Sequence, residues 1–213
     1  NQIIWLIFVV FFVLLIGLVV GWLSDRLNKG EAFRCFCTPE RLDALRKDQM
    51  SSGSGKLGYD GYCLRLTQEE IDKKLANKED YVVRLKVPRE GVCKVSDLLR
   101  DEIEIAWSEV DMQVLLKSDG MPTYHLANVV DDHHMEITHV IRGDDHINNT
   151  PRQINLFNAL GWPVPVYAHV PSILGGDGKR LSKRHGAVSV MQYQQDGYLS
   201  SALLNYLVRL GWA

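Results

Sequence analysis

The first 24 residues carry no charged side chain, and this feature most constrains how the chain can fold. Between Ile3 and Leu23 every residue is apolar except two glycines. A helix of that length spans about 30 Å, the thickness of the hydrocarbon core of a bilayer. Trp5 and Trp22 stand near its ends, and cationic residues follow it but do not precede it. We therefore expect a transmembrane-type helix over residues 3–23, with membrane contact there and the rest of the chain on the cytoplasmic side.

Two other interpretations of this segment exist. A signal peptide has an apolar region of roughly 7–15 residues, a basic start and a small-residue cleavage site. The segment here is longer, begins with the uncharged Asn1 and Gln2, and is followed by no such site. The second interpretation is that a foreign segment has been joined to the chain by fusion or by an error in the gene structure. That interpretation and a genuine anchor remain open alternatives.

The composition after residue 24 is typical of a globular domain. All 24 Lys and Arg and all 26 Asp and Glu lie there, so the positive and negative charges nearly balance. This balance provides no general basic face for nucleic acid, although a local cationic loop is compatible with it. The absence of a second long apolar run argues against a protein with several membrane spans.

Capping and turn residues predict the regular elements. Thr38 and Pro39 open a helix that ends near residue 50, and Thr67 begins a second helix with a capping box. Thr150 opens a helix that Gly161 ends. Because strands alternate with helices after residue 113, we predict an α/β fold with parallel strands. The remaining helices are expected over 122–134 and 199–210, and strands over 81–87, 113–117, 137–141 and 164–170.

A loop rich in glycine and cations lies between residues 175 and 186. Lys179, Arg180, Lys183 and Arg184 fall within six residues of one another. Such a loop can fold over a polyphosphate and place its cations against charge that develops at phosphorus. A solvated basic turn is the alternative interpretation.

A second group of polar residues precedes this loop. Tyr124 and Asn128 are four residues apart, so they share one helix face. Arg142 directly follows a predicted strand, where open α/β sheets bind ligands and an Arg can hold a carboxylate by two hydrogen bonds. A carboxylate at such a strand end can accept a hydrogen bond from a ribose hydroxyl. The alternative is an ordinary ion pair between Arg142 and Asp144 or Asp145.

These residues together resemble one enzyme family. The sequence over 181–186 resembles the second signature of class I aminoacyl-tRNA synthetases, Lys-Met-Ser-Lys-Ser. Residues 117–153, 167–193 and 197–212 are similar to bacterial-type glutamyl-tRNA synthetases, and the similarity extends from Asp25 to Ala213. The resemblance implies an α/β, Rossmann-like catalytic domain and a cytoplasmic enzyme.

The implied reaction attaches glutamate to tRNA(Glu) in two steps. Glutamate and ATP first form glutamyl-adenylate, and the glutamyl group then passes to the tRNA; Mg²⁺ arrives with the ATP. By resemblance, Lys183 is the catalytic residue, because it would stabilise the transition state from which pyrophosphate leaves. The implied glutamate contacts are Tyr124, Asn128 and Arg142, and the implied ATP contacts are Asp145, His146, Leu181, Ser182, Lys183 and Arg184.

The resemblance also sets the expected domain organisation. Residues 25–112 correspond to a small inserted region of the catalytic domain, and residues 113–213 to its second half. The first half of the family's catalytic domain, with its His-Ile-Gly-His signature, and the anticodon-binding domain find no counterpart in the sequence. We therefore expect an incomplete domain that is inactive by itself. The alternatives are a membrane-tethered remnant without catalysis and a glutamyl-queuosine-type tRNA-modifying enzyme.

Three cysteines resemble part of a zinc site found in some members of the family. Cys35, Cys37 and Cys63 match three of its ligands, whereas the position of the fourth ligand holds Arg65. A cation does not ligate zinc, and a structural zinc site needs four ligands. We therefore predict no bound metal, with these three thiols as the only candidates.

Overall fold

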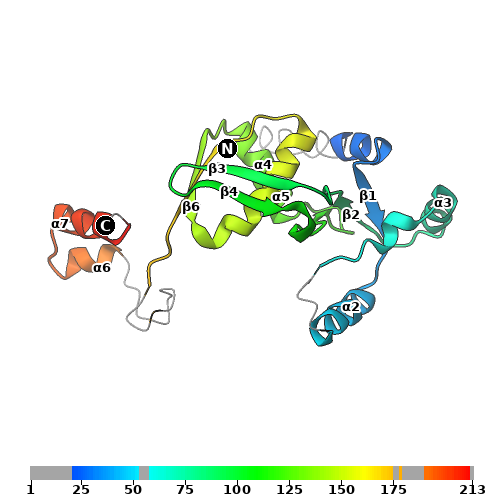
Figure 1. Cartoon of the computed structure of the whole chain (residues 1–213), viewed down its shortest axis with the longest axis horizontal. Helices are drawn as coiled ribbons and strands as arrows, with labels where there is room; N and C mark the ends of the chain where they lie inside the picture. Colours follow the sequence, from blue (N-terminus) through cyan, green and yellow to red (C-terminus); the bar gives the residue numbers. More distant parts are fainter. Residues whose placement is uncertain (1–20, 53–57, 175–177, 179–189, 212–213) are drawn as a thin grey trace, which may run out of the picture. The chain divides into compact units, whose positions relative to one another are not determined.

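The computed structural model describes residues 21–52, 58–174, 178 and 190–211 (Figure 1). The chain divides into two compact units, and it passes between them several times. The first unit contains Asn1–Lys94, Glu104–Ile137 and Asn149–Val164; the second contains Val95–Ile103, Thr138–Asn148 and Pro165–Ala213.

The first unit contains a small antiparallel sheet. Strands β1 (Ala32–Cys35), β2 (Val82–Leu85) and β5 (Val114–Leu116) pair in the order β1-β2-β5. Helices α2 (Pro39–Ser51) and α3 (Gln68–Ala76) lie between the first two strands in the sequence. Both begin as their sequences predict: Thr38 accepts a hydrogen bond from the amide of Arg41, and a complete capping box begins α3.

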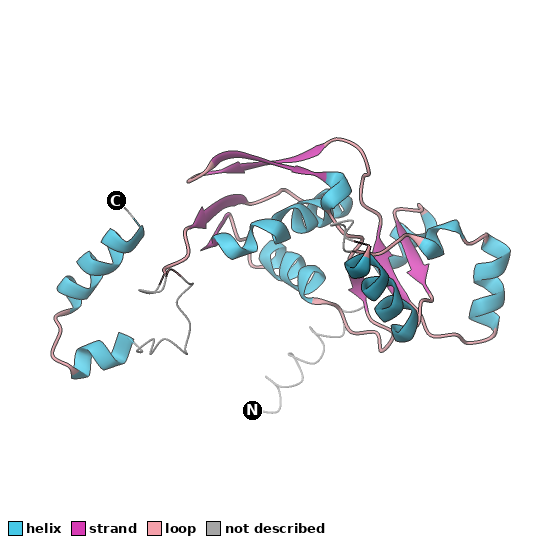
Figure 2. Ribbon diagram, turned by 60° about the horizontal axis from the view of Figure 1, so that its bottom comes forward, coloured by secondary structure: helices cyan, strands magenta, loops and turns pink. Residues whose placement is uncertain are grey.

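Helices α4 (Tyr124–His134) and α5 (Thr150–Leu160) lie side by side in the same unit (Figures 1 and 2). Together with the sheet they enclose an apolar core that excludes water almost completely. Gly161 ends α5 with a backbone φ of 70°, a left-handed conformation that favours glycine. The most deeply buried members of this core are Leu85, Leu115, Leu126, Val129, Leu156 and Phe157.

A four-stranded sheet has the order β4-β3-β7-β6. Strands β3 (Val92–Asp97) and β4 (Asp101–Ala106) are divided between the two units, whereas β6 (His139–Gly143) and β7 (Val166–Val170) belong to the second. Strand β7 runs parallel to both β6 and β3. The predicted parallel pairing is therefore confirmed for β6 and β7. It is wrong for β5, which also lies after residue 113 but pairs antiparallel with β2. The second unit also contains α6 (Val190–Gln195) and α7 (Ser200–Gly211).

Most predicted elements are present, but two expectations about strands fail. The sequence analysis missed β1, β3 and β4. It also predicted a buried strand over 137–141, whereas β6 begins at His139 and the side chain of Ile141 is 69% exposed. Strand β6 is at an edge of its sheet, so its apolar side chains receive less cover than those of a central strand.

The start of the described chain belongs to the first unit. Of the transmembrane-type helix predicted over 3–23, residues 3–20 lie outside the described part of the chain. Residues 21–28 are helical, and Leu23 is buried in the apolar core. Arg26 is one of the cationic residues that follow the predicted span; it pairs with Asp25 and Glu31 and donates a hydrogen bond to the carbonyl of Ala159. The end of the predicted span is thus packed against protein.

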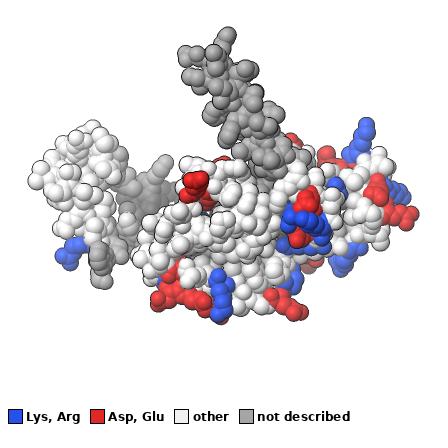
Figure 3. Space-filling view, turned by 90° about the horizontal axis from the view of Figure 1, so that it is seen from above, with Lys and Arg blue, Asp and Glu red and all other residues white. Residues whose placement is uncertain are grey.

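No helix within the described ranges combines the length and the apolar character needed to cross a membrane. On the face seen in Figure 3, acidic and basic side chains are interspersed. That arrangement agrees with the nearly balanced charge of the sequence.

Candidate functional site

Arg142 lies at the end of β6, next to His169 on β7. The parallel register places these two residues opposite each other. The Nε of Arg142 donates a hydrogen bond to Nε2 of His169 at 3.2 Å, and Nη2 lies 3.5 Å from the carbonyl oxygen of His146. The guanidinium also lies over the ring of Tyr167, 5.2 Å from its centroid. Because the carboxyl ends of parallel strands are where open α/β sheets bind ligands, Arg142 occupies the predicted kind of position.

His169 is held in turn by a buried carboxylate. Its Nδ1 lies 2.6 Å from Oδ2 of Asp97, and its backbone amide donates to the same carboxylate. The amides of Leu99 and Arg100 donate to the other carboxylate oxygen. Burial raises the pKa of Asp97, but the hydrogen bonds from His169 and the backbone amides outweigh it, so the net pKa is lowered.

Sequence reasoning missed both Asp97 and His169. They are 72 residues apart and lie on strands whose pairing no local pattern predicts. The available signal was that His169 is the one polar residue of β7 and that Asp97 continues the alternating pattern of β3 at a buried position.

Asp144 has a structural partner of its own. Its carboxylate forms an ion pair with Arg100 at 2.8 Å and accepts a hydrogen bond from the Ser172 hydroxyl at 2.7 Å. The bond from Ser172 and the charge of Arg100 lower the pKa of Asp144, although desolvation opposes them. Asp144 therefore holds the chain after β6 to neighbouring segments of the second unit.

Asp145 and His146 follow in the same short 3₁₀ helix, Asp144–Asn149. The Nε2 of His146 lies 3.8 Å from Oδ2 of Asp145, and both side chains are partly exposed. Gly143 makes this arrangement possible, because a Cβ at that position would lie 2.5 Å from Oδ1 of Asp145. A side chain at position 143 would therefore require the carboxylate of Asp145 to move.

Tyr124 and Asn128 lie one turn apart on α4, in the first unit. The side chain of Tyr124 is 58% exposed, and its ring packs edge-on against His125. The Oδ1 of Asn128 accepts a hydrogen bond from Nε2 of Gln153, itself buried on α5. With Oδ1 engaged, the amide nitrogen is the group that Asn128 offers to a ligand.

Tyr124 also lines a cavity of about 590 Å³ in the first unit. Arg84 on β2 and Gln113, the residue before β5, also line it. The Cζ of Arg84 lies 4.3 Å from the centroid of the Tyr59 ring. The side-chain oxygen of Gln113 is buried without a hydrogen-bond partner among the described residues. The lining of the cavity thus includes three arginines, Arg46, Arg84 and Arg152, together with the rings of Tyr59, Tyr124 and His125.

The structure leaves the predicted ATP-binding loop untested. Leu181, Ser182, Lys183 and Arg184 lie outside the described residues. Of the other predicted site residues, Arg142, Asp145 and His146 come together in the second unit, and Tyr124 and Asn128 share a face of α4 in the first.

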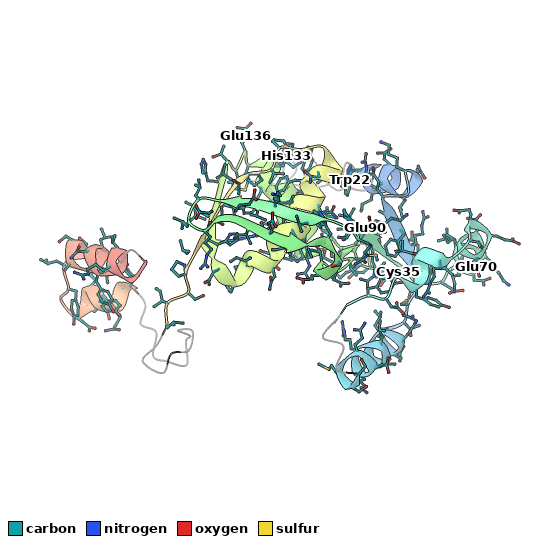
Figure 4. The ribbon with its side chains drawn as sticks, viewed as in Figure 1. Trp22, Cys35, Glu70, Glu90, His133 and Glu136 are labelled. Carbon is teal, nitrogen blue, oxygen red and sulfur yellow. The ribbon has the colours of Figure 1, made fainter. Side chains whose placement is uncertain are left out.

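The three cysteines predicted as the only metal candidates do cluster. The Sγ atoms of Cys35, Cys37 and Cys63 lie within 4.8 Å of one another, with Cys35 at the end of β1 (Figure 4). The hydroxyl of Tyr59, which sequence analysis missed, lies 3.6 Å from the Sγ of Cys37. A hydrogen bond from Cys63 lowers the pKa of Cys35, and the same bond raises the pKa of Cys63.

This cluster does not fit a four-ligand structural zinc site. Among the residues that the structure describes, no further His, Cys, Asp or Glu joins the three thiols. Arg65, at the position where the family's fourth ligand stands, lies over the ring of Tyr62 instead. Structural zinc takes its four ligands from Cys and His, so the site lacks one of them.

Comparison with known proteins relates this arrangement to one family. Residues 19–213 match the family model for tRNA synthetases class I (E and Q), catalytic domain. The chain is 54% identical over 190 residues to a glutamate–tRNA ligase of Psychrobacter sp., and 52% identical over 189 residues to one of Cellvibrio japonicus. Each of these alignments covers 89% of this chain but 37% of the relative.

Solved structures agree with these matches. The crystal structure of a glutamate–tRNA synthetase from Elizabethkingia anophelis superposes with a TM-score of 0.79 at 33% identity, over 93% of this chain and 44% of that one. A glutamate–tRNA ligase from Elizabethkingia meningosepticum, solved in complex with its amino acid, gives a TM-score of 0.71 at 34% identity, over 86% of this chain and 42% of that one. The chain therefore belongs to the family of class I tRNA synthetase catalytic domains of the glutamate and glutamine type.

Proposed function

We propose that the chain supplies the glutamate-recognising part of a glutamate–tRNA ligase. The observation that carries this proposal is the position of Arg142 at the carboxyl end of a parallel strand, where its guanidinium is hydrogen-bonded to one neighbouring side chain. A guanidinium matches the two oxygens of a carboxylate with paired donors. The relatives that share about half of the residues with this chain bear the name glutamate–tRNA ligase, which supports the same ligand.

Two residues of α4 complete the proposed glutamate contacts. The exposed residue Tyr124 and Asn128 lie one turn apart on the same helix face, and they offer a hydroxyl and an amide nitrogen. Both can donate hydrogen bonds to carboxylate oxygens. Glutamate carries two carboxylates, so more than one donor group is needed to bind it.

The proposed first step joins glutamate to ATP. A carboxylate oxygen of glutamate attacks the α-phosphorus, the bond from that phosphorus to the bridging oxygen breaks, and pyrophosphate leaves with the electron pair. Lys183 stabilises the charge that develops on the leaving group, and Mg²⁺ arrives bound to ATP. The proposed ATP contacts are Asp145, His146, Leu181, Ser182, Lys183 and Arg184.

The proposed second step transfers the glutamyl group to tRNA(Glu). The 2′-hydroxyl of the terminal adenosine attacks the carbonyl carbon of the adenylate, and AMP leaves. ATP, glutamate and tRNA(Glu) are thus the proposed substrates, and we place the reaction in the cytoplasm. The chain spans about 37–39% of the length of the curated relatives, so the complete activity is part of the proposal.

The test is glutamate-dependent ATP–pyrophosphate exchange, measured on the protein as its gene encodes it. Arg142→Ala should lower kcat/KM for glutamate by about 10- to 100-fold or more, because a hydrogen-bonded charge pair is lost. The preference for glutamate over glutamine should narrow, since an amide has only one acceptor oxygen to offer. Lys94→Ala is the matched control, because Lys94 pairs with Glu104 on the exposed surface.

Lys183→Ala tests the chemical step in the same assay. It should lower kcat far more than it raises the KM for glutamate, because a contact made in the transition state acts on the chemical step. An unchanged glutamate preference in Arg142→Ala would contradict the proposed ligand. An effect of Lys183→Ala on KM alone would contradict its catalytic role.

A further inference from the structure

The buried pair of Asp97 and His169 has no part in the chemistry proposed above. The side chains of both residues are completely excluded from solvent, and Nδ1 of His169 lies 2.6 Å from Oδ2 of Asp97. A buried carboxylate and a buried imidazole are costly unless each finds hydrogen-bond partners. Hydrogen bonds must therefore offset the cost of removing these two side chains from water. The hydrogen bond from Arg142 to His169 connects the pair to the proposed site.

The hydrogen bonds determine the tautomer of His169. An arginine side chain is always charged and has only donors, so Nε2 of His169 must accept the bond from Nε of Arg142. The ring is then neutral with its proton on Nδ1, which donates to Asp97. Asp97 thus fixes the tautomer, and the tautomer fixes which atom of His169 meets Arg142.

Further contacts restrict the same three residues. The ring of Tyr167 lies parallel to that of His169, with an interplanar angle of 9°. It also lies beneath the guanidinium of Arg142. The carboxylate of Asp97 is held by the amides of Leu99 and Arg100. The imidazole therefore has little freedom to tilt, and Nε2 stays directed at Arg142.

We propose that Asp97 and His169 are positioning residues that orient the guanidinium of Arg142 toward an anionic ligand. With Nε engaged by His169, an incoming carboxylate meets the guanidinium from its terminal nitrogens. The energetic consequence is that an otherwise flexible side chain is ordered before the ligand arrives. That this ligand is glutamate rests on the proposed function, whereas the orientation of Arg142 does not.

The test compares His169→Ala, His169→Gln and Asp97→Asn in the protein as its gene encodes it. A glutamine at position 169 retains an acceptor oxygen for Arg142, whereas an alanine has none. His139→Ala is the matched control, since His139 is an exposed histidine on the same strand as Arg142. Thermal unfolding establishes which variants keep a cooperative transition.

The first measurement follows the ¹⁵N-labelled side chain of Arg142, whose Nε–H signal is identified by its loss in Arg142→Lys. We expect hydrogen exchange at this site to be about tenfold faster or more in His169→Ala, and near the wild-type rate in His169→Gln and His139→Ala. Asp97→Asn should also accelerate it, because the tautomer is no longer fixed. Unchanged exchange in His169→Ala overturns the positioning role; if that variant does not fold, unchanged exchange in Asp97→Asn overturns it.

The second measurement is ATP–pyrophosphate exchange with L-glutamate as the probe. His169→Ala should raise the KM for glutamate about 10-fold to 100-fold while the KM for ATP stays within about twofold, and His169→Gln should recover most of the loss. Equal changes in both KM values, without recovery by glutamine, indicate a merely structural role and overturn the inference. If Arg142→Ala leaves glutamate use unchanged, the proposed function fails. The hydrogen-exchange rate of the Arg142 Nε–H then decides the positioning role by itself.

Discussion

The apolar core of the first unit and the polar centre of the second are buried to the same degree but by different means. In the first, Leu126 and Phe157 are almost completely excluded from solvent among other apolar side chains. In the second, Asp97 and His169 are equally buried but are stabilised by directed hydrogen bonds. Apolar burial depends on area and shape, whereas a buried polar pair depends on the presence and direction of each partner. The first arrangement therefore supplies stability, and the second supplies a defined orientation.

We expect the largest effect on stability in the apolar core. Leu126→Ala should lower the free energy of unfolding by about 3–5 kcal/mol, because it removes buried methyl groups and leaves a cavity. Leu98→Ala is the matched control, since that side chain is 63% exposed. Urea denaturation measures both variants. If Leu126→Ala lowers the free energy of unfolding no more than Leu98→Ala does, the apolar core is not the main source of stability in the first unit.

A smaller and pH-dependent effect is expected in the polar centre. Asp97→Asn should cost about 2–3 kcal/mol at pH 7, because the charged acceptor of a buried network is lost. The pKa of Asp97 is lowered in the folded state, so its stabilising effect is complete above the ordinary value near pH 4 and is lost as the pH falls through the folded value. The difference in stability between wild type and variant should therefore shrink below about pH 4.

Urea denaturation of both proteins at pH 7 and at pH 3 measures this difference. Leu126→Ala provides the comparison, because its cost involves no titrating group and should persist at both values. A difference for Asp97→Asn that stays constant with pH would show that this carboxylate does not act through its charge.

The smallest effects concern ion pairs at the surface. Arg46→Ala should change the free energy of unfolding by less than about 0.5 kcal/mol, because the side chains of Arg46 and Asp43 are 70% and 63% exposed. Arg100→Ala should cost more, about 1 kcal/mol, since Arg100 and Asp144 are only 37% and 29% exposed and Arg100 also donates to the carbonyl of His169. Thermal and urea unfolding of the two variants side by side measure the ranking. A larger loss for Arg46→Ala than for Arg100→Ala would show that burial does not determine how much these ion pairs stabilise the fold.

Local chemistry made much of the fold predictable. The cap at Thr38, the capping box at Thr67 and the left-handed Gly161 all act within a few residues of the helix ends that they define. Strand β6 was also recognisable from its apolar residues, although both of its ends were placed two residues early and its burial was wrong. Exposure of Ile141 depends on which strand lies at the edge of the sheet, and no local pattern contains that information.

The sequence by itself determined several helix ends, the alternation of strands and helices, and the resemblance on which the expected site residues rest. These depend on neighbouring residues, or on a pattern preserved along the chain. Only the tertiary structure decided that Asp97 meets His169 across 72 residues, that Asp144 pairs with Arg100, and that Leu23 belongs to the core of the first unit. The physical reason is that a hydrogen bond or a buried contact depends on distance in space. Parallel strand pairing brings together residues whose separation along the chain carries no signal.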